Sequence, residues 1–137
     1  MTITFGQIAP APYWKEFFEA GRPYTAREVL EIAPAEHACL IVTESDYALI
    51  PVSLALALGH AAAARYDGWE FSVKKSPHAA AWLLLNAISH GAWSDAWDAA
   101  IKRFSRDETR RVAHEARMEV WEWAAAWLME HIDQENG

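Results

Sequence analysis

The sequence predicts a mainly α-helical protein: a compact bundle of five or six helices with one long C-terminal helix. Three observations support this fold class. Residues 105–136 contain neither glycine nor proline, apolar residues recur there every three or four positions, and several earlier segments begin with a helix-capping residue. A chain of 137 residues suits one hydrophobic core. We therefore expect a single helical domain over residues 1–137, with room for a small β hairpin or a short β pairing.

The long C-terminal helix is expected to begin at Ser105, which stands three residues before Glu108. This is the spacing of a capping box, in which each side chain accepts a hydrogen bond from a backbone amide of the first turn. Residues 118–132 are apolar around most of the circumference. A helix end of this kind lies in a core or under another chain, so we expect a partner or a second copy of the chain there. Residues 133–137 are expected to be a frayed tail.

Short elements are expected before residue 35. Residues 1–11 are interpreted as an extended arm that includes a short edge strand, and residues 13–20 as a short helix. A second capping box, Thr25 with Glu28, predicts the next helix. Pro34 is expected to end this helix, because a proline disfavours helical angles in the residue before it.

The segment 35–51 supports two interpretations. Its first residues favour a helix over 35–44. The β-branched residues that follow favour a hairpin of 38–43 against 47–51 instead. Both interpretations stay open at the level of sequence.

Two elements are expected between residues 53 and 75. Ser53 is predicted to cap a helix over 54–66, in which Gly59 and its small neighbours would let another helix approach closely. Apolar and polar residues alternate over 69–73, as in a strand. This strand could pair with residues 2–6.

Two further helices are expected before the long one. Ser76, followed by a proline, predicts a helix that ends near Gly91. Ser94 is predicted to cap another helix that extends through Phe104. That helix either breaks at Ser105 or continues into the C-terminal helix.

The charge distribution is uneven. The formal net charge is −7, which argues against a general nucleic-acid binder because phosphate attracts positive surfaces. Residues 1–50 and 118–137 are acidic, whereas residues 102–117 carry six bases and three acids. The two acidic regions are expected to be the electrostatic contact surfaces, and an acidic surface complements a basic protein.

Other features of the sequence point to the cytoplasm. Cys39 is the only cysteine, so no internal disulfide forms, and a reducing compartment is expected. The first residues show no signal-peptide pattern. Residues 47–64 lack charged side chains, but they contain Pro51 and many alanines. We expect this segment to be a buried helix and not a membrane span.

No motif for catalysis or cofactor binding is visible. His37 and Cys39 lack the further ligands that a zinc site requires, and Cys39 lies in an apolar run, as inert buried thiols do. The glycines are scattered, so no phosphate-binding loop is present. Lys74 and Lys75 lead into the helix start at Ser76, where charge and the helix dipole could hold an anion; a plain exposed loop is the alternative interpretation. We assign no catalytic residue, metal or cofactor.

The hypothesis that the sequence favours is a non-catalytic, acidic protein-interaction domain. Eight tryptophans exceed ordinary use, and aromatic residues are enriched at interfaces. The class we expect is an inhibitor or immunity-type protein, such as a toxin immunity protein or a phage anti-defence protein of the anti-CRISPR kind. It would occlude a basic, nucleic-acid-handling partner. Trp121, with one further aromatic residue, is the predicted anchor, and the predicted charged contacts are Glu119, Glu122, Glu130 and Asp133.

Three alternatives stay open. The first is a small helical enzyme or ligand-binding domain with a pocket lined by tryptophan and histidine. The second is nucleic-acid contact through a basic stripe of Arg103, Arg106, Arg110 and Arg117, which requires the preceding helix to continue without a break. The third is a homodimer formed through the C-terminal helix.

Overall fold

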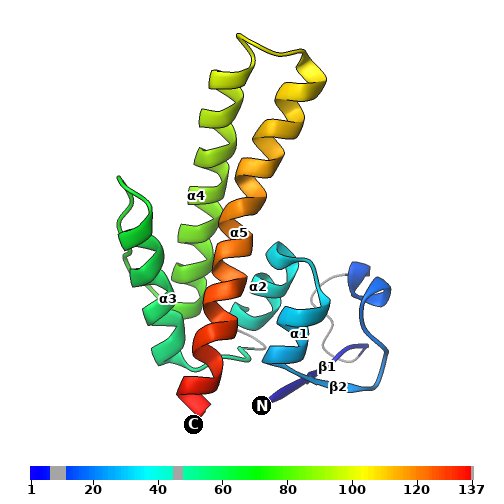
Figure 1. Cartoon of the computed structure of the whole chain (residues 1–137). Helices are drawn as coiled ribbons and strands as arrows, with labels where there is room; N and C mark the ends of the chain where they lie inside the picture. The colour runs from blue at the N-terminus through cyan, green and yellow to red at the C-terminus, as the bar shows by residue number, and fades with distance from the viewer. Residues whose placement is uncertain (7–11, 45–47, 137) are drawn as a thin grey trace.

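The computed structural model describes residues 1–6, 12–44 and 48–136, and it confirms the mainly α-helical fold class (Figure 1). Five α-helices and a two-stranded antiparallel sheet follow one another in this part of the chain. They are, in order, β1 (Thr2–Thr4), the 3-10 helix η1 (Pro12–Glu16), β2 (Pro23–Thr25), α1 (Ala26–Ile32), α2 (Ala35–Thr43), α3 (Val52–Arg65), α4 (Pro77–Ala100) and α5 (Arg106–Asn136). Within these ranges no helix combines the length and apolar character needed to cross a bilayer.

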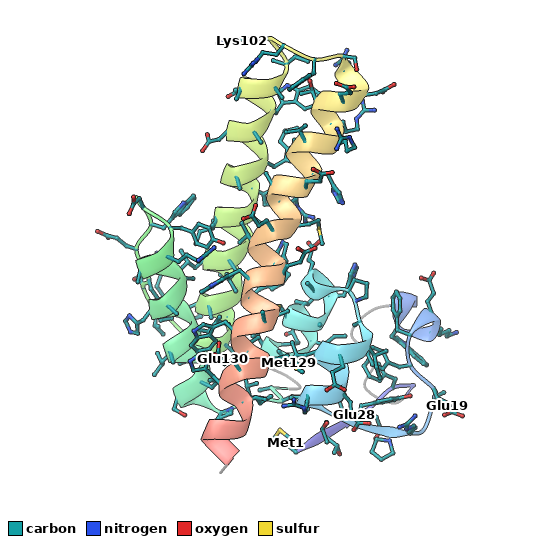
Figure 2. All side chains as sticks on the ribbon, in the orientation of Figure 1. Met1, Glu19, Glu28, Lys102, Met129 and Glu130 are labelled. Carbon is teal, nitrogen blue, oxygen red and sulfur yellow. The ribbon has the colours of Figure 1, made fainter. Side chains whose placement is uncertain are left out.

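α4 and α5 form a long antiparallel hairpin that is the spine of the molecule (Figure 1). α3 packs mainly against α4, and α2 packs mainly against α5. The smaller elements cover the half of the hairpin that contains the C-terminal end of α5, and the other half projects beyond them (Figure 1). Figure 2 shows Lys102 at the tip of this hairpin.

The hydrophobic core lies where α2, α3, α4 and α5 meet. Leu58, Leu85 and Leu128 are fully buried there. Trp121 is also fully buried, and its ring stacks on Trp82 with 4.6 Å between centroids. Burying one large apolar side chain contributes about 1.5–3 kcal/mol. The tryptophans of this region therefore stabilise the fold itself.

Both predicted capping residues lie at helix starts, but among the described residues only the first pair, Thr25 with Glu28, forms both hydrogen bonds of a capping box. The Thr25 side chain accepts a hydrogen bond from the Glu28 amide, and the Glu28 carboxylate accepts one from the Thr25 amide, which lowers the pKa of Glu28. α1 ends as expected, because Ala33, before the proline, is extended. Ser105 Oγ accepts a hydrogen bond from the Glu108 amide at 3.2 Å. α5 extends to Asn136 and so includes most of the expected tail.

The N-terminal elements differ from the prediction in two ways. The expected helix over 13–20 is only the short η1. β1 pairs with β2, with Ile3 opposite Tyr24, and the predicted pairing with residues 69–73 is wrong. Phe5 continues from β1 into an aromatic cluster, where it stacks on Phe18 at 4.3 Å. This aromatic cluster fixes the start of the chain close to β2. The expected arm includes residues 7–11, which lie outside the described part.

The segment 35–51 is helical at its start, so the hairpin interpretation is wrong. Ile41 and Val42 of α2 are buried against the rest of the core. Their lower helix propensity amounts to less than about 0.7 kcal/mol per residue, which the burial outweighs. Thr43 is buried too, and its hydroxyl donates to the Cys39 carbonyl oxygen at 2.6 Å. Tyr47, part of the second predicted strand, lies outside the described residues.

α3 begins two residues earlier than expected, at Val52. Pro51 is its N-cap, so Ser53 lies in the first turn and does not cap the helix. The expected close approach of another helix at Gly59 is replaced by the ring of Phe71, which packs directly on this glycine. A Cβ atom at this position would lie 2.3 Å from the Phe71 ring.

α4 is one helix of 24 residues, and the predicted division into two helices is wrong. The expected start is confirmed, with Ser76 as N-cap and Pro77 in the first turn. The helix continues through Gly91, although a glycine there costs about 1 kcal/mol relative to alanine. The Trp69 ring packs so closely that a Cβ at residue 91 would lie 3.1 Å from it. The chain leaves the helix only at the turn after Ala100.

Candidate functional site

The C-terminal half of α5 exposes a face that is rich in acidic residues. From Glu115 to Ile132 five residues are exposed, and four of them are glutamates. We call Glu115, Glu119, Glu122 and Glu130 the acidic face; the fifth exposed residue is Ala126. At about 1.5 Å per residue the acidic face is roughly 22 Å long. Glu130 marks its C-terminal end (Figure 2).

Most of the acidic face is electrostatically uncompensated. Arg111 pairs with Glu115 at 3.0 Å, at one end. In the described part of the chain no ion pair joins Glu119, Glu122 or Glu130 to a base. Neighbouring carboxylates at i,i+3 and i,i+4 repel each other by about 0.2–0.5 kcal/mol per pair. These glutamates therefore carry a mutual repulsion that no base in the described part of the chain relieves.

The acids of α1 show a contrasting arrangement. Glu28 lies 3.5 Å from Arg22, and Glu31 lies 3.3 Å from Arg27. Exposed pairs of this kind contribute little to stability, but they reduce the net field of the helix. α1 is therefore a mixed surface, whereas the acidic face of α5 carries negative charge only.

Trp121 lies in the hydrophobic core and is not accessible at the surface. It is 0 % exposed, and Cys39 Sγ lies 4.0 Å from its carbonyl oxygen. The predicted role as a partner anchor needs an accessible ring, so the position of Trp121 in the core argues against it. Trp123 is half-buried, two residues along the helix and close to the acidic face. Its ring meets Tyr66 edge-on at 5.9 Å, and the Arg65 guanidinium lies 5.5 Å from it.

Sequence reasoning could have favoured Trp123 over Trp121. At 100° per residue, Trp123 lies about 40° around the helix from Glu119, whereas Trp121 lies about 160° away. The side chain of Asp133, another predicted contact, lies outside the described residues.

The predicted basic stripe is not continuous. The helix breaks between α4 and α5, so Arg103 lies in the turn and Arg106 is the first residue of α5; both are exposed. Arg110 lies 3.5 Å from Asp107. Arg117 faces α2 and forms a two-pronged ion pair with Glu36.

The predicted anion contacts therefore fall into two groups. Arg103 and Arg106 are exposed at the tip of the hairpin. Arg117 is only 20 % exposed and holds α2 to α5. The structure assigns this arginine a stabilising role.

Cys39 and His78, two side chains with reactive groups, are poorly placed for catalysis because both are buried. Cys39 is fully buried, and burial, with a smaller effect of the nearby Glu36 charge, raises the pKa of its thiol to about 12. A thiol that stays protonated at neutral pH is a weak nucleophile. His78 is buried, with Nε2 2.8 Å from the Ile50 carbonyl oxygen. Among the described residues no three His, Cys, Asp or Glu side chains gather closely enough to bind a metal ion.

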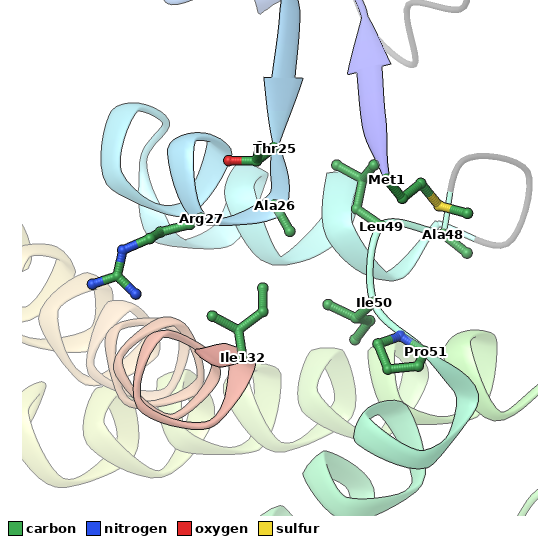
Figure 3. Close-up of a pocket in the computed structure, with 9 residues that line it drawn as sticks. All are labelled: Met1, Thr25, Ala26, Arg27, Ala48, Leu49, Ile50, Pro51 and Ile132. Carbon is green, nitrogen blue, oxygen red and sulfur yellow. The ribbon is translucent and has the colours of Figure 1, made fainter. Parts of the chain in front are cut away.

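The described residues enclose several surface hollows, of which three are considered. One, of about 490 Å³, lies between α1, the segment before α3 and the end of α5 (Figure 3). Ala26, Ile50 and Ile132 make it largely apolar, and the one charged side chain among its described lining residues, Arg27, pairs with Glu31. Two others, of about 180 Å³ and 540 Å³, lie on either side of Leu83. No histidine lines any of the three hollows.

Comparison with known proteins adds no assignment. No protein-family model matches the chain, and no curated protein and no solved structure matches it.

Proposed function

We propose that this protein is a non-catalytic interaction domain that binds a basic protein through the acidic face of α5. The observation that carries the proposal is the composition of that face: four of its five exposed residues are glutamates, and three of these form no ion pair in the described part of the chain. Such a surface gains most from a partner that supplies bases. Trp123, half-buried at its border, supplies an aromatic contact of the kind found at interfaces.

The kind of partner follows from charge complementarity. Proteins that handle nucleic acid carry clustered lysine and arginine side chains, because they neutralise phosphates. The acidic face has the same sign of charge as nucleic acid, so both would be attracted to the same surface. Binding there would occlude the nucleic-acid site, as an immunity protein or an anti-defence protein of the anti-CRISPR kind does. Long-range attraction would also raise the association rate, which salt would lower.

The test compares two variants with the same net charge. In the first, the four glutamates of the acidic face become glutamine. In the matched control, four exposed acids elsewhere are neutralised by the substitutions Glu16→Gln, Asp67→Asn, Asp95→Asn and Asp98→Asn.

Tagged wild-type chain is used to capture partners from cells that encode it. The proposal expects a captured protein whose nucleic-acid binding the wild-type chain inhibits. The acidic-face variant should lose both capture and inhibition, and the control variant should keep both. Equal behaviour of the two variants, or a captured protein without a basic surface, would contradict the proposal.

A further inference from the structure

We propose that the groove between residues 69–76 and the start of α4 binds a small anionic amphiphile, a single carboxylate on an apolar chain. The groove has a volume of about 540 Å³. Small-ligand sites commonly have volumes of about 300–1,000 Å³. The groove belongs to different elements from the acidic face, so this proposal does not depend on the proposed function.

The groove exists because the loop is held away from a helix face made of small residues. Ala79 and Ala80 form part of the α4 side of the groove. On the loop side, Trp69 packs on Gly91 of α4, and Phe71 packs on Gly59 of α3. These two aromatic contacts fix the loop between two helices, so it cannot simply collapse onto the alanines.

The walls of the groove leave apolar surface in water. Leu83 is 62 % exposed and Trp69 is 37 % exposed. Leu84, which is buried, also contributes to the lining. A ligand with an apolar body would remove the Leu83 and Trp69 surfaces from water, which is the main driving force in sites of this type.

The charges of the groove are polarised along the loop. Lys74 and Lys75 lie at the end where α4 begins, and both are exposed. In the part of the chain that the structure describes, neither lysine forms an ion pair with an acid. Glu70 is the one acid among the described residues of the lining, and it lies beside Trp69 at the other end of the loop. We therefore expect the carboxylate near the lysines and the apolar body along Leu83 towards Trp69.

The test is a two-dimensional NMR titration of the full chain with three ligands that share an eight-carbon body. Octanoate should bind saturably and shift the amide signals of residues 69–84. Octanol should bind more weakly at the same place, because it lacks the charge. Octyltrimethylammonium should bind at least tenfold more weakly than octanoate.

Two variants separate the two parts of the site. Lys74→Gln with Lys75→Gln should weaken octanoate binding about tenfold and leave octanol binding unchanged. Leu83→Gln should weaken both. All three side chains are exposed, so we expect these variants to fold, and circular dichroism melting curves will check this. The control Lys102→Gln with Arg103→Gln removes the same charge at the hairpin tip and should change nothing.

Three results would overturn the proposal. One is the absence of saturable shifts in residues 69–84 with octanoate. Another is equal affinity for the cationic amphiphile. A third is an equal loss of octanoate binding in the lysine variant and in the hairpin-tip control.

Discussion

Gly59 and Phe71 together provide a test of how the loop after α3 is held. The Phe71 ring lies where a side chain at residue 59 would stand, with three ring atoms within 2.5 Å of an added Cβ. The ring also meets His60 edge-on at 5.0 Å. The perturbation is Gly59→Ala, made both in the natural chain and in a Phe71→Ala background. We expect Gly59→Ala to stabilise the protein only in the Phe71→Ala background.

The magnitudes follow from two opposing effects. Alanine is favoured over glycine in a helix interior by about 1 kcal/mol. In the natural chain the new methyl group must displace the Phe71 ring. Removing the packing of a half-buried phenylalanine lowers the stability of the protein by about 1–2 kcal/mol. Gly59→Ala should therefore be neutral or destabilising by up to about 1 kcal/mol. In the Phe71→Ala background only the propensity effect is left, so Gly59→Ala should stabilise by about 1 kcal/mol.

The assay is urea unfolding of the four chains of the double-mutant cycle, followed by tryptophan fluorescence. The reasoning predicts a coupling energy of about 1–2 kcal/mol between residues 59 and 71. If Gly59→Ala had the same effect in both backgrounds, to within about 0.5 kcal/mol, the ring would not be packed on Gly59 as described.

Three further predictions concern α2 and α5. Glu36→Ala should lower the free energy of unfolding by about 1–3 kcal/mol, because the ion pair with Arg117 is only about one-fifth exposed. The double variant Glu36→Ala with Arg117→Ala should lose less stability than the two single variants added together, and urea unfolding measures both effects. Cys39 should resist a thiol reagent at pH 8 until the chain unfolds, and stability should fall as the pH rises from about 9 towards 12, because only the unfolded thiol ionises in that range. Fast modification of Cys39 in the folded protein, or a free energy of unfolding that stays constant between pH 9 and pH 12, would contradict this prediction. Glu119→Gln with Glu122→Gln should raise stability by a few tenths of a kcal/mol at low salt, and this gain should vanish at high salt; a loss of stability at low salt would contradict the repulsion.

The features that local sequence predicts well are those with a local cause. The capping box at Thr25 and the capping hydrogen bond at Ser105 were predictable, because these bonds join residues three positions apart. The break before Ser105 was one of two predicted outcomes. The length of α5 followed from the absence of glycine and proline.

The wrong predictions have non-local causes. α4 continues through Gly91 because Trp69, 22 positions earlier, packs against it. Residues 69–73 alternate like a strand because Trp69 and Phe71 pack on two different helices, and not because they pair in a sheet. The pairing of β1 with β2 likewise depends on an aromatic cluster around Phe5 that joins distant segments.

The candidate site was predictable in part. The exposed glutamates follow from the helical period once the buried side is known. Which side is buried depends on contacts with α2, including the pair between Glu36 and Arg117, and sequence alone does not supply them. The helical period does separate the buried Trp121 from the half-buried Trp123 once the glutamates are taken as the exposed side, because Trp123 lies near Glu119 around the helix and Trp121 lies far from it.

The most direct test of the proposed function is the affinity of the captured partner for three chains: wild type, the acidic-face variant and the charge-matched control. Binding is titrated at about 0.05 M and 0.15 M salt, because exposed charges are screened differently at the two concentrations. We predict that the acidic-face variant binds at least tenfold more weakly at low salt, that its affinity depends less on salt, and that the control binds within twofold of wild type. Equal losses in both variants, or an unchanged affinity of the acidic-face variant, would contradict the claim that α5 is the binding surface.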